Sequence, residues 1–202
     1  EPVRSIEFIH TENNVNNIIR PSNGYYLRYT STLFGSILGG ERNFIKITND
    51  FRQYFPVFKG TIAYRIKFGF IHNMNKNDVL PTYYTFKLGG QSSLRGWATP
   101  SVYDDGRLIY ELINIEYRFP IFKKWGGELF IDSGRLYDTI NKFSNEKFNW
   151  NYGFGMTYDT AIGPIRIEYA IPYGMLNNNI ENENLSSENN KGIVHISLLY
   201  MF

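Results

Sequence analysis

The sequence predicts an all-β protein, most simply a transmembrane antiparallel β-barrel of eight strands. Apolar and polar residues alternate with a period of two through most of the chain, which is typical of strands with two unlike faces. The alternating segments are about ten residues or longer, the length at which a tilted strand crosses a bilayer. The connections between them alternate between short and long, as do the periplasmic turns and extracellular loops of outer-membrane barrels.

The alternation is clearest in three segments. In residues 60–72, GTIAYRIKFGFIH, isoleucine, tyrosine and phenylalanine alternate with residues that include Arg65 and Lys67. Residues 107–122, RLIYELINIEYRFPIF, and 163–172, GPIRIEYAIP, repeat the pattern. A helix requires a period near 3.6 residues, and no segment shows one convincingly. The predicted strands are 3–12, 24–35, 43–57, 60–72, 107–122, 126–135, 150–160, 163–173 and 192–202.

The two faces of these strands differ sharply in polarity. One face is almost entirely Ile, Leu, Phe and Tyr, as contact with lipid requires. The other carries full charges of both signs and is expected to line a lumen. These charged residues are Arg28, Lys46, Asp50, Arg52, Arg65, Lys67, Glu116, Arg118, Asp132, Arg166 and Glu168. A soluble sandwich also alternates in this way and remains the alternative.

Aromatic residues near the predicted strand ends favour the membrane barrel over the sandwich. Such residues form girdles at the two membrane interfaces. The candidates are Tyr25, Tyr54, Phe55, Phe119, Phe122, Trp125, Tyr173, Tyr200 and Phe202.

The connections set the expected topology. The short ones are 57–60, 122–127 and 159–164, and the long ones are 35–43, 73–106, 136–149 and 174–191. If the last strand ends in the periplasm, eight strands from about residue 24 give an even barrel with both ends on that side. Residues 1–22 are then an N-terminal segment, either periplasmic or an extra partial strand, and residues 23–202 form the transmembrane barrel domain.

Composition excludes several function classes. The net charge of +2 gives no nucleic-acid footprint, and the absence of cysteine removes disulfides and thiolate metal sites. His10, His72 and His195 lie in separate segments and match no catalytic motif. We therefore expect no enzyme activity, no catalytic residue, no cofactor, no metal and no small-molecule substrate. Glu116 and Asp132 could form an acid/base pair. The favoured interpretation is that they act as counter-ions for lumenal arginines.

Two segments stand apart from the strand pattern. Residues 86–100, FKLGGQSSLRGWATP, form a Gly- and Ser-rich loop that carries a single arginine, and we expect it to fold inward or across the barrel mouth. The C-terminal segment GIVHISLLYMF is expected to keep Tyr200 and Phe202 on the lipid face with the residues before them.

These pieces together resemble the BamA superfamily of outer-membrane assembly and secretion proteins, which includes BamA-, TamA- and FhaC-like members. GGQSSLRGW resembles the family's long loop with its arginine tip, and GRLIYELINIEYRFPI resembles the strand after it. ELFIDSG and YGFGMTYDTAIGPIRIEYAIP resemble the F-x-D-x-G strand and the final hairpin. The resemblance implies a short member or a C-terminal barrel region without POTRA domains.

The resemblance also implies roles for particular residues. Arg95 is the loop arginine of the tip Leu94, Arg95, Gly96 and Trp97, and its implied lumenal partners are Glu116 and Asp132. Gly96 would permit close backbone approach, and Trp97 would pack against the wall. An eight-stranded barrel has a lumen filled by its own side chains, so deep entry of this loop conflicts with that strand count.

The resemblance further implies an integral protein of the outer membrane of a Gram-negative cell envelope that takes part in protein assembly, insertion or translocation, acting within a complex. Tyr200 and Phe202 would belong to a C-terminal recognition strand. Expected partners are outer-membrane lipid, including lipopolysaccharide, and other proteins or further copies of the chain. The alternative is a structural barrel that anchors partner proteins without insertase activity.

Overall fold

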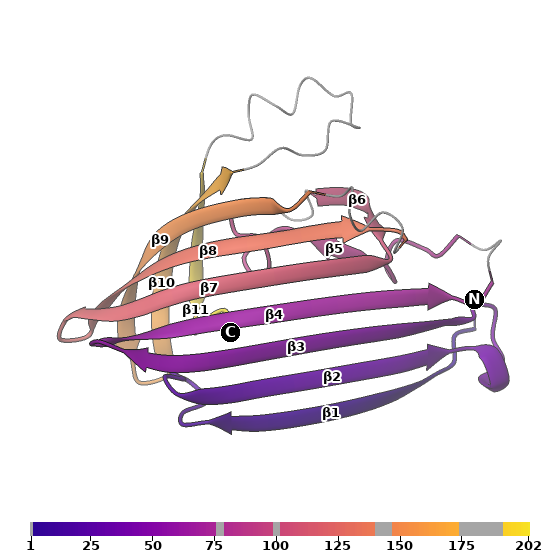
Figure 1. Cartoon of the computed structure of the whole chain (residues 1–202), viewed down its shortest axis with the longest axis horizontal. Coiled ribbons are helices and arrows are strands. Elements are labelled where there is room, and N and C mark those ends of the chain that lie inside the picture. The colour runs from indigo at the N-terminus through magenta and orange to yellow at the C-terminus, as the bar shows by residue number, and fades with distance from the viewer. Residues whose placement is uncertain (1, 76–78, 99–101, 140–146, 174–191) are drawn as a thin grey trace, which may run out of the picture.

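The computed structural model describes residues 2–75, 79–98, 102–139, 147–173 and 192–202. It confirms the all-β antiparallel fold. One large sheet contains nine strands, in the order β1-β2-β3-β4-β7-β8-β9-β10-β11 (Figure 1). They are β1 (Ser5–Val15), β2 (Gly24–Phe34), β3 (Phe44–Val57), β4 (Gly60–Asn73), β7 (Ile109–Phe122), β8 (Trp125–Tyr137), β9 (Asn149–Thr160), β10 (Gly163–Tyr173) and β11 (Ile193–Leu198).

Two short strands lie in the long connection between β4 and β7. β5 (Phe86–Leu88) pairs with β6 (Val102–Arg107) in a separate sheet, and the loop between them carries the arginine tip. The short helix η1 (Ser36–Leu38) in the β2–β3 connection is a 3-10 turn. Within the described ranges, no helix is long and apolar enough to span a membrane. The Asn-rich connection 174–191 lies outside the described residues.

The strand count differs from the expected eight because the N-terminal segment is a strand of full length. β1 pairs with β2 at every position from Ser5 opposite Phe34 to Val15 opposite Gly24. Its 11 residues match the length of β2. This pairing satisfies main-chain groups of β2 that hydrocarbon could not satisfy. Among the described residues, β1 and β11 each have one neighbouring strand and do not pair with each other.

The sheet curls strongly, so that β9, β10 and β11 turn behind the front strands (Figure 1). At the end where the short turns lie, the β1–β2 connection reaches the end of β9. Arg20 Nη2 donates to the Thr160 carbonyl oxygen at 2.7 Å, and Arg20 Nε lies 3.4 Å from Asp159 Oδ1. Side-chain contacts therefore bridge this rim, although the edge strands are not hydrogen-bonded to each other.

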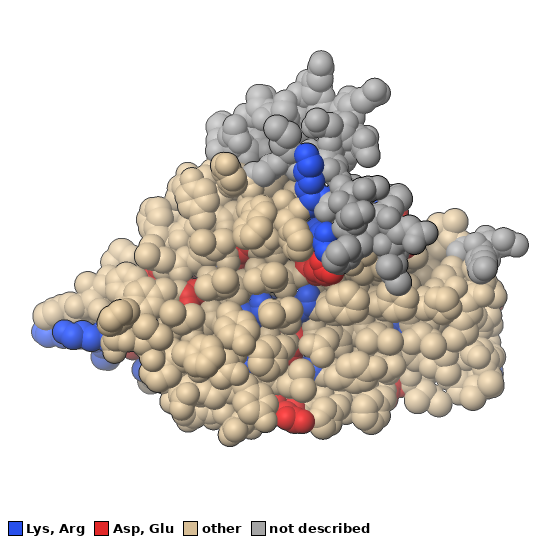
Figure 2. All heavy atoms as spheres, in the orientation of Figure 1, with Lys and Arg blue, Asp and Glu red and all other residues tan. Residues whose placement is uncertain are grey.

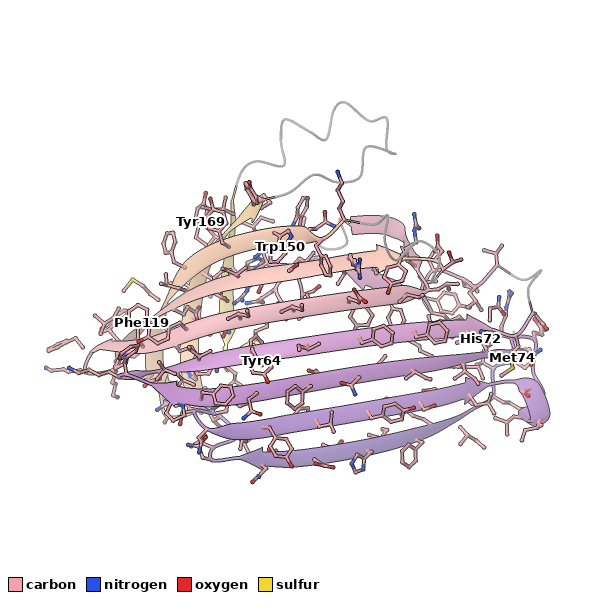
Figure 3. All side chains as sticks on the ribbon, in the orientation of Figure 1. Tyr64, His72, Met74, Phe119, Trp150 and Tyr169 are labelled. Carbon is pink, nitrogen blue, oxygen red and sulfur yellow. The ribbon has the colours of Figure 1, made fainter. Side chains whose placement is uncertain are left out.

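The outer face of the sheet is apolar and exposed, as the alternation predicts. Ile115, Ile131 and Ile167 are 48%, 49% and 54% exposed in the middle of three strands. Tyr64, Trp150 and Tyr169 also project from this face (Figure 3). In Figure 2, Lys and Arg atoms gather at the end formed by the β3–β4 and β7–β8 turns, a second group of charged atoms lies near the top of the view, and most of the remaining visible face is uncharged.

The inner face is polar and buried. It contains Arg65, Glu116, Asp132, Arg166 and Glu168, each at most 5% exposed. Three residues expected in the outer aromatic girdle behave differently. Tyr54 and Phe202 are 2% and 4% exposed, and the Tyr200 ring lies 3.9 Å from the guanidinium carbon of the buried Arg118. Their assignment to the outer face is therefore wrong.

Candidate functional site: the inward loop and the lumenal charge cluster

The loop between β5 and β6 enters the interior and is held there through its backbone. Arg65 Nη1 donates to the Ser92 carbonyl oxygen at 3.4 Å, and Asn114 Nδ2 donates to that of Ser93 at 2.9 Å. The carbonyl oxygen of Arg95 lies 2.7 Å from His195 Nε2, which donates in the tautomer protonated at that nitrogen. Strands β4, β7 and β11 thus hold three backbone positions of one loop.

The Arg95 side chain is completely buried and contacts three carboxylates. Its Nε and Nη2 donate to the two oxygens of Asp132 at 2.8 and 2.7 Å. Its Nη1 donates to Glu116 Oε1 at 2.7 Å and to Glu168 Oε1 at 2.6 Å. The guanidinium also lies 3.5 Å from the centre of the Phe130 ring. The fork on Asp132 is the bidentate geometry that makes such charge-assisted bonds strong and directional.

The residues next to Arg95 in the loop tip fix how far the loop enters the lumen. Leu94 is fully buried and Trp97 is 4% exposed, and both belong to an apolar cluster with Leu88, Leu112 and Leu136 at the far end of the lumen from the short turns. This cluster anchors the loop on one side of the arginine, while the carboxylates bind it on the other.

Gly96 lies too close to the wall for any side chain. A Cβ atom there would stand 2.5 Å from Asn151 Cβ and 2.9 Å from the Pro172 backbone nitrogen. We expect Gly96→Ala to displace the loop and lower the temperature at which the folded barrel unfolds, measured by loss of the fast-migrating folded band in an unheated gel. Ser92→Ala, in the same loop, is the matched control and should leave this temperature nearly unchanged. An equal midpoint for both variants would contradict the close packing.

Arg95 belongs to a larger buried network, here called the lumenal charge cluster. It consists of Arg95, Arg118, Arg166, Glu116, Glu128, Asp132 and Glu168. Arg166 Nη2 lies 3.0 Å from Glu128 Oε2 and donates to Glu168 Oε1 at 2.8 Å. Gly155 gives Glu128 room, since a Cβ there would lie 2.5 Å from Glu128 Oε1. Every carboxylate of the cluster contacts at least one arginine.

This arrangement suits fixed positioning better than proton transfer. Glu116 and Asp132, the possible acid/base pair, both receive hydrogen bonds from Arg95, so their oxygens act as counter-ions. In the part of the chain that the structure describes, no three His, Asp or Glu side chains are arranged to hold a metal ion. What the cluster can do is lock a loop inside the lumen.

The conflict between deep loop entry and a narrow lumen is resolved by the sheet itself. The narrow lumen that would exclude the loop belongs to a closed barrel of eight strands, whereas the described sheet has nine strands whose edges do not pair with each other. The loop fills the space inside this sheet. Glycines on β9 add to it, because Gly153 leaves room for the Phe130 ring, 2.4 Å from where a Cβ would stand.

The C-terminal residues do not continue the last strand. β11 ends at Leu198, and Leu199 takes a positive φ of 72° that turns the chain inward. Phe202 then packs with Tyr54 and Ala63, and its carbonyl oxygen accepts a hydrogen bond from Arg118 Nη2 at 2.8 Å. The expected continuation of the lipid-facing row through Tyr200 and Phe202 is wrong, because an aromatic pocket and an arginine inside the sheet draw the terminus in. A recognition role for these residues stays a prediction.

Four partners of the loop are absent from the sequence-based site: Arg65, Asn114, Glu168 and His195. Glu168 faces inward by strand parity, so parity could have suggested it, but no local pattern fixes its distance from Arg95. His195 lies 100 residues from the carbonyl oxygen that it contacts. Only the curl of the sheet, which brings β11 to the loop, reveals that contact.

Comparison with known proteins agrees with this architecture. A family model described as the Omp85 superfamily domain matches residues 4–186. A BamA outer-membrane protein assembly factor of Nitratidesulfovibrio vulgaris is 26% identical over 76% of this chain and 21% of its own length. The crystal structure of Haemophilus ducreyi BamA lacking POTRA domains 1–3 superposes with a TM-score of 0.72 at 20% identity, over 85% of this chain and 39% of that one.

The chain thus spans about a fifth of the curated relative and two fifths of the crystallised one. The match to the family model covers nearly the whole sequence, and the curled antiparallel sheet is the fold of the matched BamA barrel. The chain therefore belongs to the Omp85 superfamily and is an integral protein of the outer membrane.

Proposed function

We propose that this chain acts in the assembly or translocation of proteins at the outer membrane, as the barrel part of a larger complex, and that it is not an enzyme. The observation that carries the proposal is the combination of a filled lumen with unpaired sheet edges. The loop and the lumenal charge cluster occupy the interior, so a client polypeptide has little room there. The edges of β1 and β11 each have one neighbour among the described strands.

An unpaired edge inside a bilayer requires a partner, because hydrocarbon cannot satisfy main-chain N–H and C=O groups. A client strand can meet this requirement by adding to the sheet through main-chain hydrogen bonds, which depend little on its sequence. β11 suits this role because it pairs with β10 over only six positions, from Ile165 opposite Leu198 to Ala170 opposite Ile193. A short pairing is the easier one to rearrange.

The partners that this function requires follow from the same surfaces. The exposed apolar outer face requires outer-membrane lipid, including lipopolysaccharide. The edges suit other proteins or a second copy of the chain.

Reconstitution tests the activity directly. The protein, folded into liposomes, should accelerate the insertion of an unfolded barrel substrate, measured as the rate at which the substrate gains its folded gel mobility. Liposomes with an equal amount of an unrelated folded barrel protein are the control for bilayer defects. Equal rates in the two preparations would overturn the insertase proposal.

The second candidate is a structural barrel that anchors partner proteins without insertase activity. The rigid packing of the loop favours it, because three strands and three carboxylates fix the loop in place. A partner that co-purifies in fixed stoichiometry, together with no acceleration in liposomes, would establish the anchor.

A further inference from the structure

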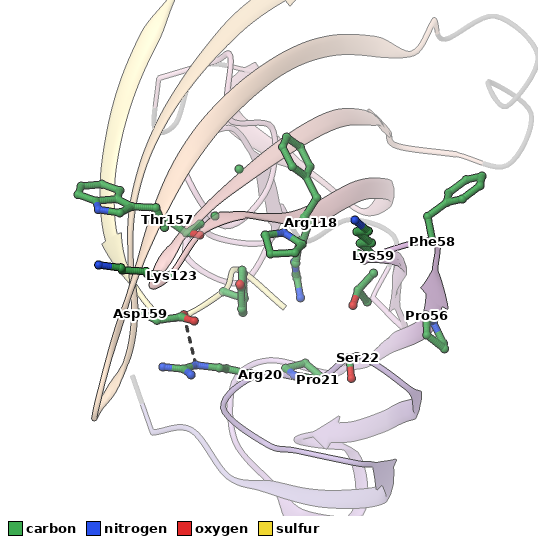
Figure 4. A pocket seen from close by; sticks show the side chains of 18 residues that line it. Arg20, Pro21, Ser22, Pro56, Phe58, Lys59, Arg118, Lys123, Thr157 and Asp159 are labelled. Atoms are coloured by element: carbon green, nitrogen blue, oxygen red, sulfur yellow. Dashed lines mark ion pairs between the residues drawn. The ribbon is translucent and has the colours of Figure 1, made fainter.

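The lumen opens at the end of the short turns through a cavity of about 420 Å3. Figure 4 shows this cavity from close by, with side chains from the β1–β2 connection, the β3–β4 turn and the β7–β8 turn around it. In outer-membrane barrels the short turns face the periplasm, so this mouth, here called the turn-end mouth, opens toward that compartment.

Arg118 contributes a buried positive charge to the wall of the mouth. Arg118 is 6% exposed and lines the cavity. Its Nε donates to Glu116 Oε2 at 2.8 Å and its Nη2 to the Phe202 carbonyl oxygen at 2.8 Å. Its Nη1 is enclosed by protein and makes no hydrogen bond to the described residues. Arg118 therefore acts on the mouth through its positive charge, not as a donor open to the cavity.

The charges around the mouth favour an anionic ligand. Arg20, Lys59 and Lys123 line the cavity together with Arg118, and Asp159 is the single carboxylate among the lining residues. That carboxylate already lies 3.4 Å from Arg20 Nε. The exposed amines of Lys59 and Lys123 sit on two different turns, so they flank the opening from two sides. The field at the entrance is therefore positive.

The volume of the cavity and its apolar lining residues indicate a ligand larger than a small ion. Pockets of several hundred cubic ångström hold ligands of many atoms. Prolines and aromatic rings form much of this wall, including Pro21, Pro56, Phe119, Pro120 and Trp125. We infer that the turn-end mouth binds an acidic peptide segment of a partner protein, with its acidic groups near Arg20, Lys59 and Lys123 and its apolar side chains against the rings. The site is separate from the sheet edges, so the inference stands whether or not the chain inserts clients.

Calorimetric titration of the folded protein in a nonionic detergent tests the inference. The probe is a short synthetic peptide of Glu, Pro and Phe, and the control is the same peptide with Gln in place of Glu. The Glu peptide should bind saturably, more weakly as salt is raised, and the Gln peptide should not bind. Equal binding of the two peptides, or no binding of either, would overturn the inference.

Variants locate the binding. Because Arg118 also pairs with Glu116 and its replacement can impair folding, the principal variant is Lys59→Gln with Lys123→Gln, which changes exposed side chains only. It should weaken binding of the Glu peptide by roughly fivefold, as the loss of two exposed charge pairs implies. Lys87→Gln, an exposed lysine of β5 outside the cavity lining, is the matched control and should have no effect. Equal affinities for the two variants would contradict the assignment of the site.

Inorganic phosphate distinguishes a peptide site from a simple anion site. It should compete with the Glu peptide only weakly, because it fills a small part of the cavity and makes no contact with the apolar wall. Displacement by phosphate at an affinity equal to that of the peptide would overturn the peptide assignment.

Discussion

Replacing Arg95 by alanine is expected to destabilise the folded barrel by about 3–5 kcal/mol, the cost of removing one partner from a buried ion pair. The variant would leave Asp132 with uncharged donors alone among the described residues: the amides of Asn114 and Asn151 and the backbone N–H of residue 95. Glu116 and Glu168 would each retain Arg166. Asp132 therefore carries most of the penalty, because among the described residues Arg95 is the one arginine that forms an ion pair with it. The measurement is the temperature at which the folded gel band disappears.

A double substitution separates the lost charge pair from general damage to the loop. Asp132→Asn in the Arg95→Ala background removes the uncompensated charge, so the double variant should lose less stability than the sum of the two single variants. Lys87→Ala, an exposed cation at the start of the same loop region, should leave the midpoint unchanged. A midpoint for Arg95→Ala equal to that of Lys87→Ala would show that the buried contacts do not stabilise the barrel.

Much of the fold follows from the sequence because strand parity is a local property. Residues two apart share a face, so Arg65, Glu116 and Glu168 could be assigned to the interior from the neighbours of each alone. The boundaries also agree closely: 60–72 was expected for β4, and Gly60–Asn73 is found. The same rule failed at the C-terminus, because the positive φ at Leu199 breaks the alternation and nothing in SLLYMF signals it.

The strand count shows the limit of topology arguments. A barrel with an even number of strands and both ends on one side required that the N-terminal segment not be counted as a full membrane-spanning strand. The pairing of β1 with β2 shows that the demand for satisfied main-chain groups outweighs that rule.

The candidate functional site, like the fold, could be predicted from the sequence only in part. The loop arginine and two of its carboxylates lie in recognisable motifs, whereas Glu168 and His195 reach the loop only through the curl of the sheet. The turn-end mouth was not foreseen at all. It combines Arg20, Lys59, Arg118 and Lys123 from four separate segments, and ordinary hairpin lysines look the same in sequence whether or not they surround a cavity.

Substituting Ile115 by arginine should prevent stable integration into the membrane. Ile115 lies in the middle of β7 on the outer face and is 48% exposed, with Tyr64 and Ile131 opposite it on the neighbouring strands. A lipid-facing arginine near the bilayer midplane costs roughly 2–4 kcal/mol, and an outer face of isoleucine and tyrosine offers it no counter-ion. The fraction of protein that resists extraction with alkaline carbonate after folding into liposomes should fall well below that of the unsubstituted chain.

Ile37→Arg is the matched control, because it makes the same chemical change outside the sheet. Ile37 lies in η1 and is 89% exposed, in a connection on the side opposite the short turns, where water surrounds the new charge. It should integrate as well as the unsubstituted protein. Normal integration of Ile115→Arg would show that this face does not contact lipid. A soluble sandwich would then explain the alternation of apolar and polar residues better than a membrane barrel. Failure of Ile115→Arg beside normal behaviour of Ile37→Arg would fix the lipid-facing side of the sheet at β7, and the strand register then extends that assignment to β4 and β8.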